Sequence, residues 1–312
     1  MAMNTFTGIN PTSQKFYDKV LLKRLLPKLV WMKHGVKKNI PQKEGDTANY
    51  RRYRKLANAT TPLQEGVTPT GQALVQENVN AVVKGYGSYV PMTDKLDMMG
   101  IDDNVTEATE LLGEQAGETL DIVVRDVVAA GTNVFYVGGG VTRVGVAAGN
   151  IVDGATMRRI RRIMARNNVE KIAAAGGPAA YIAFIHPDAA YDVMGDAAWV
   201  NAKHYADPKA IEEGEIGMLN GVRYIETTLA PVFTGAGVGG LDVYGTVVIG
   251  KGGYGVPDVD GSAKPKTIVK QLGSEGSGDP LNQRSSVAWK AYLATVRLEE
   301  LAILRVEHAV TA

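Results

Sequence analysis

Two strand-like runs flank a connection rich in turn residues, and together they predict a β-hairpin over residues 45–89. The first run, residues 46–56, is polar on both of its sides, so neither side suits a hydrophobic core. The second run alternates, and its apolar face consists of Val75, Val79, Ala81 and Val83. A two-stranded ribbon of this kind is only marginally stable by itself in water. We therefore expect another surface to cover its apolar face, most simply a second copy of the same chain.

Composition limits the classes of protein to which this chain can belong. With 312 residues, 45% of them hydrophobic, it can bury a substantial core in one large or two medium domains. The net charge of +1 argues against a protein whose main function is to bind nucleic acid through a strongly basic surface. The absence of Cys excludes disulfides, thiolate catalysis and zinc sites built on sulfur. The polar N-terminus predicts no signal peptide, and the longest apolar run, residues 172–185, is too short to cross a membrane.

The clearest helix is predicted between residues 103 and 130. Apolar residues recur there at helical spacing from Val105 to Val127, and Gly131 ends the pattern. At 1.5 Å per residue such a helix is a rod of roughly 40 Å, long for a globular core. An acidic row on its other side is predicted to face solvent, and its members are Glu107, Glu110, Glu114, Glu118 and Asp121.

Further helices and a β-rich C-terminal half complete the pattern. Ser13 can cap a short amphipathic helix in the N-terminal arm, and Asp153 can cap a helix that carries five Arg. A buried strand at 180–185 is followed by Pro187, which starts a short helix. The strands predicted beyond Gly221 span residues 222–227, 241–249, 267–272, 286–296 and 301–307.

The sequence predicts no catalytic, metal or cofactor site. The Gly runs at 138–140 and 250–253 lack the order of a phosphate-binding loop and are predicted to be ordinary loops. Four scattered His offer no local metal motif, and His186 is predicted to be a loop or helix-start residue. No Gly-x-Ser-x-Gly elbow and no carboxylate pair stands out. We therefore expect a protein that is not an enzyme and uses no cofactor.

The helix after Asp153 predicts a basic surface, for which two interpretations remain open. Its Arg side chains could contact phosphates, which would make binding salt-sensitive, although no aromatic residues alternate with them to stack on bases. Alternatively the face is solvated or bridges subunits by charge complementarity, as Arg51, Arg52 and Arg54 could also do. The Arg residues of the helix are Arg158, Arg159, Arg161, Arg162 and Arg166.

Linked motifs in the hairpin and near the C-terminus resemble one protein family. The hairpin motifs are Tyr50-Arg51-Arg52-Tyr53, Thr60-Thr61-Pro62-Leu63, Glu65-Gly66-Val67-Thr68-Pro69 and Tyr86-Gly87-x-Tyr89. The C-terminal motif is Asp279-Pro280-Leu281-x-Gln283-Arg284-x-Ser286-Val287-x-Trp289-Lys290. In this order they resemble the major capsid protein family of tailed bacteriophages, typified by the coliphage N-four capsid subunit, over residues 15–308.

That resemblance implies an α+β fold, the tailed-phage major capsid fold of the Hong Kong phage type. The implied parts are an N-terminal arm (1–44), an extended loop hairpin (45–92), a peripheral domain with a spine helix (93–150), an axial domain (151–285) and C-terminal strands that return to the peripheral domain (286–312). The order of elements predicted from the residues themselves agrees with this arrangement.

The function implied by the resemblance is that of a major capsid protein. Such a protein self-assembles into hexamers and pentamers of an icosahedral shell that encloses double-stranded DNA non-specifically. It would reside in the virion capsid after assembly in the host cytoplasm, without a membrane, and scaffold, portal and decoration proteins are further partners that the family suggests. An encapsulin-like compartment is the alternative, and a cargo enzyme inside purified particles would distinguish it.

The predicted inter-subunit residues belong to the extended loop and to the basic faces. We expect them at contacts between copies because the hairpin's apolar side and the clustered charges both require a partner. In the hairpin they are Arg51, Arg52, Arg54, Thr61, Pro62, Leu63, Glu65, Val67, Val75, Val79 and Val83. On the Arg-rich helix they are Arg158, Arg159 and Arg162.

Overall fold

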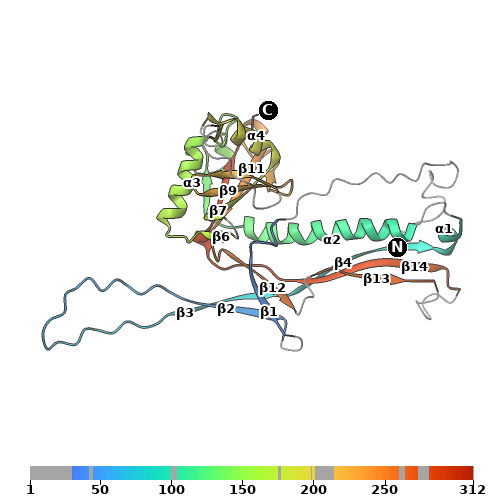
Figure 1. Cartoon of the computed structure of the whole chain (residues 1–312), viewed down its shortest axis with the longest axis horizontal. Helices are drawn as coiled ribbons and strands as arrows, with labels where there is room; N and C mark the ends of the chain where they lie inside the picture. Colours follow the sequence, from blue (N-terminus) through green and yellow to red (C-terminus); the bar gives the residue numbers. More distant parts are fainter. Residues whose placement is uncertain are drawn as a thin grey trace.

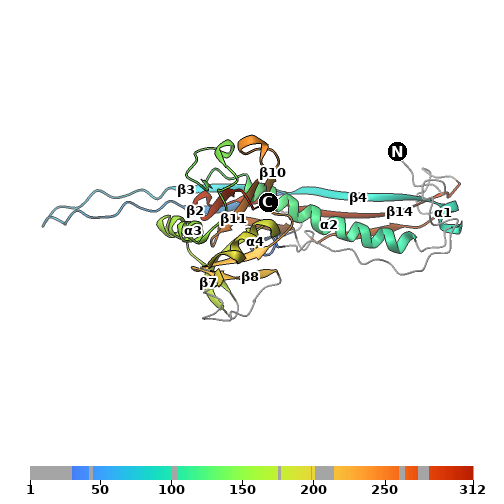
Figure 2. The same ribbon diagram turned by 90° about the horizontal axis from the view of Figure 1, so that it is seen from above.

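The molecule combines a compact domain with two long extensions. The computed structural model describes residues 30–41, 45–99, 104–174, 177–197, 199–200, 214–259, 264–272 and 281–311. A long helix and a narrow sheet, together called the rod below, extend from the compact domain in one direction, and a slender loop extends in the other (Figures 1 and 2). The predicted N-terminal helix after Ser13 and the motif residues Asp279 and Pro280 lie outside the described residues.

The compact domain is built on an eight-stranded sheet against which two helices pack. The strands run in the order β5-β16-β11-β7-β9-β8, with β10 beside β11 and β6 beside β7. Helix α3 (Gly154–Arg166) begins at Asp153, whose side chain accepts a hydrogen bond from the backbone N–H of Thr156, and α4 (Pro187–Gly195) begins at His186. Both predicted helix starts are confirmed. The strands are β5 (Val134–Tyr136), β6 (Ile172–Ala174), β7 (Gly177–Ile185), β8 (Glu215–Leu219), β9 (Val222–Glu226), β10 (Val232–Phe233), β11 (Val243–Ile249) and β16 (Ile303–His308).

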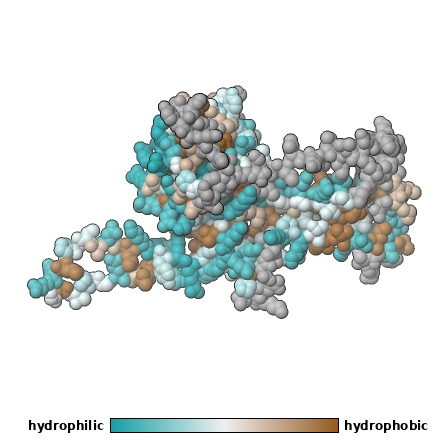
Figure 3. Space-filling model, in the orientation of Figure 1, coloured by the Kyte–Doolittle hydropathy of each residue, from teal (hydrophilic) through white to brown (hydrophobic). Residues whose placement is uncertain are grey.

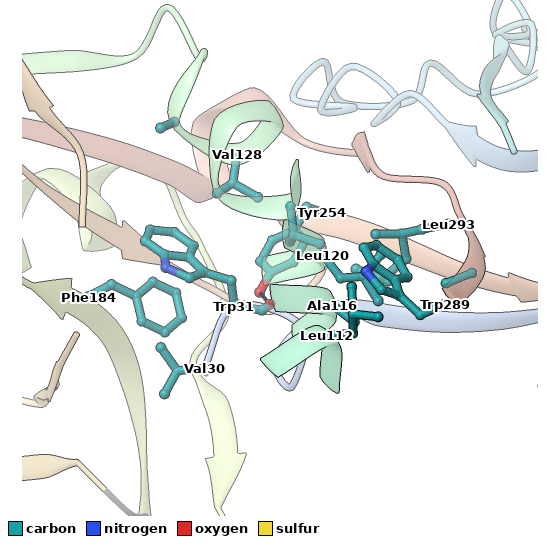
Figure 4. Packing of buried hydrophobic residues seen from close by; sticks show 14 of the residues in the cluster. Val30, Trp31, Leu112, Ala116, Leu120, Val128, Phe184, Tyr254, Trp289 and Leu293 are labelled. Atoms are coloured by element: carbon teal, nitrogen blue, oxygen red, sulfur yellow. Dashed lines mark hydrogen bonds between the residues drawn. The ribbon is translucent and has the colours of Figure 1, made fainter. Parts of the chain in front are cut away.

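The rod consists of one long helix on a three-stranded sheet. Helix α2 (Asn104–Ala129) confirms the predicted long helix, and the short α1 (Asp94–Met99) precedes it. It packs on β4 (Lys84–Thr93) and β14 (Arg284–Leu293), while β13 (Lys266–Lys270) lies beyond β14 at the edge of the sheet. The side of β14 that faces the helix contributes to the core the buried residues Val287, Trp289, Ala291 and Leu293 (Figure 4).

The hydrophobic core continues from the rod into the compact domain. Trp31 is fully buried, and its ring centroid lies 4.2 Å from that of Phe184 in β7 (Figure 4). Asp121 of α2 is only 1% exposed, because its carboxylate accepts hydrogen bonds of 3.0 Å from the backbone N–H groups of Val30 and Met32. The prediction that Asp121 belongs to a solvated acidic row is therefore wrong. The backbone N–H groups of Val30 and Met32 satisfy this carboxylate in place of water.

The hairpin lies at the root of the loop and rests on another three-stranded sheet, smaller than that of the compact domain. Strands β2 (Thr47–Tyr53) and β3 (Gln76–Val82) pair antiparallel along their full lengths. The smaller sheet has the order β1-β12-β15, formed by Val36–Ile40, Tyr254–Val259 and Val296–Arg297.

The apolar side of the hairpin is covered by its own chain at its base. Ala81 is 2% exposed and shares a small buried cluster with Ile40, Ala48 and Ala294, against which Val83 also packs. The prediction that this face lacks a core within the chain is therefore wrong at the base. The reason is that β1, just before the hairpin, and the segment after β14, distant in sequence, already occupy the surface that was assigned to a second copy.

Two strands lie in a different part of the fold from that predicted. The family resemblance groups residues 93–150 and 286–312 around the long helix, whereas β5 and β16 within those ranges both belong to the eight-stranded sheet. There β16 pairs with β11 on one side and β5 on the other, which suits a strand that is buried on both faces. Strand β14 pairs with β4 along its full length. The strands predicted at 222–227, 241–249 and 267–272 are confirmed as β9, β11 and β13.

Acid is expected to destabilise the fold through His308. Its ring is fully buried, with Nε2 2.9 Å from Oγ1 of Thr246 and Nδ1 2.8 Å from the carbonyl of Ala309. Burial lowers its pKa to about 4, although Asp192 and Glu307 act in the opposite direction. The unfolded chain binds this proton near pH 6.5, so the stabilisation is complete above that pH and is lost as the pH falls through 4. At roughly 1.4 kcal/mol per pH unit, the loss is about 3 kcal/mol.

Urea unfolding of unassembled subunits near neutral pH and at about pH 4 measures this effect. The variant His308→Gln retains a hydrogen-bonding side chain but cannot take up the proton, so it should lose less stability than the natural chain between the two conditions. An equal loss in both proteins would contradict the assignment to His308.

Candidate inter-subunit surfaces

The loop beyond the hairpin, residues 54–75, is exposed along its whole length. Leu63 is 78% and Leu74 is 71% exposed, and the space-filling view shows hydrophobic residues at intervals along the loop (Figure 3). Apolar side chains held this far from a core are typical of an interaction surface. The predicted inter-subunit residues that lie here are Arg54, Thr61, Pro62, Leu63, Glu65, Val67 and Val75.

The chain reverses at a tight turn at the tip of this loop. The backbone N–H of Val67 donates to the carbonyl of Gln64 at 3.2 Å, and Gly66 between them has φ +76°. This turn favours glycine because a residue with a Cβ is strained in that conformation. Where the loop joins the hairpin, the N–H of Arg54 donates to the carbonyl of Val75 at 2.9 Å. Backbone hydrogen bonds therefore hold the turn at the tip and the junction with the hairpin, and the apolar side chains between them stay exposed.

An ionic network fixes the root of the loop. Arg52 donates from Nε to Glu77 at 2.8 Å and from Nη1 to the carbonyl of Leu298 at 2.9 Å and the carboxylate of Glu299 at 2.5 Å. Arg54 also binds Glu77, and hydrogen bonds from Arg54 and Arg52 hold the pKa of that carboxylate below its ordinary value. Two predicted inter-subunit Arg therefore already have partners within the chain. Arg52 joins both hairpin strands to the segment after β15, and Arg54 adds a second link to Glu77 of β3.

The predicted apolar row of the hairpin, Val75, Val79, Ala81 and Val83, lies on one side, but only its outer end is exposed to solvent. Val75 is 48% exposed, whereas Val79 and Val83 are half-buried near the base. Arg51 is exposed and lies on the opposite side of β2 from Arg52. A second copy could therefore contact the outer part of this row and not its root.

Helix α3 presents the predicted basic face. Met157, Ile160 and Met164 are fully buried against the eight-stranded sheet, and Ile163 packs beside them. The guanidinium of Arg159 lies 4.8 Å from the ring centroid of Phe135 in β5, a cation–π contact. The helix thereby separates core from surface as its periodicity predicts. Its exposed basic residues are Arg158, Arg159, Arg161, Arg162 and Arg166.

One candidate surface was not predicted from the sequence: the side of the rod's sheet that faces away from α2. Gly85 and Gly87 of β4 help to leave a hollow of about 880 Å³ there. Its walls include Tyr89, Ile268 and Tyr292, each 40–48% exposed. The alternation of Gly with aromatic residues along β4 is the sequence signal that could have identified it, because alternate residues of a strand share a face.

The Gly runs and His186 have structural positions in the described part of the chain. No group of three or more His, Cys, Asp or Glu side chains among the described residues could hold a metal ion. The two Gly runs are loops, as predicted, and His186 caps α4 with its imidazole, which accepts a hydrogen bond from the backbone N–H of Asp188. Within the same described ranges, no helix is both long and apolar enough to span a bilayer.

Comparison with known proteins relates both the sequence and the fold to phage capsids. A family model for phage capsid protein matches residues 96–241. The structure is similar to the cyanophage Pam1 capsid asymmetric unit, with a TM-score of 0.75 and 15% identity, covering 99% of this chain and 100% of that chain. It is also similar to the capsid of Ralstonia phage GP4, with a TM-score of 0.73 and 11% identity, covering 100% of this chain and 99% of that one.

A third similar structure is the acidic stable capsid of Helicobacter pylori bacteriophage KHP30, with a TM-score of 0.68 and 11% identity, covering 99% of this chain and 98% of that chain. No curated protein matches the sequence. The structural likeness extends over the rod, the compact domain and the loop together, and the family match covers α2 and a large part of the compact domain. The chain therefore has the mixed helix and sheet fold of tailed-phage capsid proteins, and its residues 96–241 carry the sequence pattern of the phage capsid protein family.

Proposed function

We propose that this chain is a major capsid protein that self-assembles into the hexamers and pentamers of an icosahedral shell. The observation that carries the proposal is the exposed loop of residues 54–75, which buries nothing in its own subunit although it bears apolar side chains. The likeness to phage capsid structures over nearly the whole chain supports it. The subunit acts by binding and not by catalysis.

In this proposal, each part of the fold corresponds to a part of the Hong Kong phage type of capsid fold, as in the N-four capsid subunit. Helix α2 is the spine, and together with α1, β4, β13 and β14 it forms the peripheral domain. The eight-stranded sheet, including β5 and β16, forms the axial domain with α3 and α4. The hairpin with residues 54–75 is the extended loop, and residues 1–44 are the N-terminal arm.

Assembly depends on the extended loop of one subunit lying over its neighbour. The loop and the rod, whose sheet carries the hollow, extend in opposite directions, so the loop can reach this hollow only on another copy, and in a ring each loop would reach the next copy head to tail (Figure 1). Contacts of this heterologous kind close into rings when the rotation between copies allows it. Apolar loop residues such as Leu63 and Val67 would then be covered by a neighbouring subunit.

The shell encloses double-stranded DNA non-specifically and forms in the host cytoplasm. The net charge of +1 is more consistent with a shell that encloses DNA than with a protein that binds DNA over its whole surface. Scaffold, portal and decoration proteins are the further partners of such a shell. The similar structures described above are all phage capsids, and no observation favours an encapsulin-like compartment.

Electron microscopy of the purified chain tests the proposal. We expect closed particles with fivefold and sixfold capsomers, and, when they are recovered from phage-infected cells, DNA that nuclease cannot reach. A chain that stays monomeric in light scattering under all assembly conditions would contradict the proposal. A cargo enzyme inside the particles would replace it with the compartment alternative.

The basic face of α3 is expected to act between subunits. Changing Arg158, Arg159 and Arg162 to Gln should weaken assembly at moderate salt more than it weakens DNA retention, because each lost charge removes one attraction to an acidic neighbouring surface. Particle yield by sedimentation and nuclease-protected DNA per particle are measured side by side. The matched control changes the same three residues to Lys, which keeps the charge and should keep assembly. Greater loss of DNA than of particles would assign the face to DNA instead.

A further inference from the structure

Strand β13 forms an open edge of the rod's sheet. It pairs with β14 along residues 266–270, and no other strand of the described chain pairs with it. All five of its residues are exposed, and Ile268 (43%) and Val269 (48%) project from opposite faces. None of them belongs to the core that α2 covers. Such an edge presents backbone N–H and C=O groups to any strand that can lie beside it.

Charges along the edge restrict which strands it can accept. Lys264, Lys266 and Lys270 are all exposed on β13 or next to it. Two β13 edges brought together would place these ammonium groups close to one another, and like charges across a strand pair are destabilising. The edge therefore disfavours pairing with its own copy but accepts a strand without positive charge.

The return arm of the loop, residues 71–75, has the matching chemistry. It contains neither a charged residue nor Pro, and it leads directly into β3, so extended backbone continues without a break. Leu74 (71% exposed) and Val75 (48% exposed) are consecutive and therefore project from opposite faces, as Ile268 and Val269 do. The outgoing arm instead carries Arg54 and Lys55, which would lie against the Lys residues of β13.

The loop and β13 lie at opposite ends of the subunit. In Figure 1 β13 lies within the rod, while in both views the loop extends away past the compact domain (Figures 1 and 2). One chain therefore cannot bring its own return arm to its own β13. A second copy placed head to tail can do so.

We propose that the return arm of one subunit adds a fourth strand to the rod's sheet of the next subunit, beside β13. The proposal rests on the capsid function, since it specifies how the extended loop binds its neighbour. Backbone hydrogen bonds along β13 supply affinity, and the alternating side chains of the added strand supply register. Leu74 and Val75 extend the apolar surfaces of Ile268 and Val269 on the two faces of the sheet.

Pairs of introduced Cys test the strand addition, because the natural sequence contains no Cys. One Cys replaces Val269, and a second is moved singly through residues 72–75 before assembled particles are oxidised. Directly opposed residues of paired strands have Cβ atoms about 4.5–5.5 Å apart, near the range that a disulfide spans. We expect a ladder of linked subunits on a non-reducing gel when the second Cys stands at alternate positions within residues 72–75, and none when it stands at the positions between them. Moving the first Cys to Ile268 should shift the pattern by one residue.

The control and a second variant keep the result interpretable. A Cys at Val141, which is 88% exposed in the compact domain, replaces the Cys on β13 and should give no ladder. Independently, Leu74→Lys places a positive charge beside the Lys residues of β13 and should abolish shells, whereas Leu74→Val should retain them.

The possible outcomes separate this inference from the proposed function. Particles that assemble but give no ladder, or ladders without alternation, overturn the strand addition and leave the capsid function standing. Equal assembly of Leu74→Lys and Leu74→Val overturns it as well. A natural chain that forms no particles would contradict the capsid function itself.

Discussion

Replacing residues 66–70 with a short Gly-Ser linker is expected to leave a folded subunit that forms no closed shells. These residues are exposed, so the change removes no buried contact within the chain. It does remove the side chain of Val67 and the turn at Gly66 that directs both arms. A contact weakened by about 1.4 kcal/mol loses tenfold in its equilibrium constant, and a shell repeats the same contact in every subunit. A modest local loss therefore becomes an all-or-none loss of particles.

Negative-stain images and sedimentation of the linker variant measure this outcome, and the urea midpoint of the subunit shows that the fold is retained. The matched control, Val67→Ile with Thr70→Ser, keeps the turn and the apolar character and should form shells. Normal particles from the linker variant would refute the role of the extended loop in assembly.

Local periodicity was sufficient to predict α2 and α3, whereas the short helix α1 was not predicted. In α2 the spacing of apolar residues and the stop at Gly131 gave a helix whose observed bounds, Asn104–Ala129, differ by only one residue at each end from residues 103–130. In α3 the capping side chain of Asp153 and the division between Met157 and the exposed Arg residues were also predicted, because both features depend on neighbours within one or two helical turns. The existence of the hairpin followed in the same way from alternation and turn residues.

Contacts between distant segments were not predicted, for a physical reason. Ala81 is buried by Ile40 and Ala294, and Asp121 by the backbone of Val30 and Met32, and neither pairing leaves a periodic signal in the sequence. The same holds for β16, whose place between β5 and β11 depends on pairing partners more than 50 residues away in the chain. The exposed loop and the basic face could therefore be predicted from the sequence. The burial of the hairpin base and of Asp121 by other segments of the same chain could not.

The inter-subunit surfaces illustrate the same limit. Arg52 was a reasonable candidate for a contact between copies, because an Arg on a polar strand has no local partner. In the fold, Glu77 and Glu299 meet it from two other segments. The hollow around Tyr89 was missed because it arises only when β4, β14 and β13 pair, so that residues from three separate segments share one face.

Glu307 of β16 is the centre of a buried charge network that joins the rod to the compact domain. Its side chain is fully buried, and its two oxygens each accept a hydrogen bond of 2.7 Å from Arg143, in a bidentate pair. Arg305 also donates to it at 2.7 Å and in addition donates to the carbonyl of Ala129, the last residue of α2. One carboxylate thus pairs with two guanidinium groups and holds one of them at the end of the spine helix. Cations near a helix C-terminus also interact favourably with its dipole.

The variant Glu307→Ala is expected to lower the free energy of unfolding by roughly 3–5 kcal/mol, the usual cost of removing one partner of a buried ion pair. The lower end applies because Arg143 is 31% exposed and can turn toward water, whereas Arg305, at 13%, cannot do so as easily. The measurement is the urea midpoint of the unassembled subunit at an unchanged m-value. Glu170→Ala, which breaks an exposed pair with Lys251, is the matched control and should leave the midpoint unchanged. Equal midpoints for both variants would show that the network does not stabilise the fold. A large shift confined to Glu307→Ala, accompanied by loss of shells, would show that the attachment of the spine to the compact domain is itself a requirement for assembly.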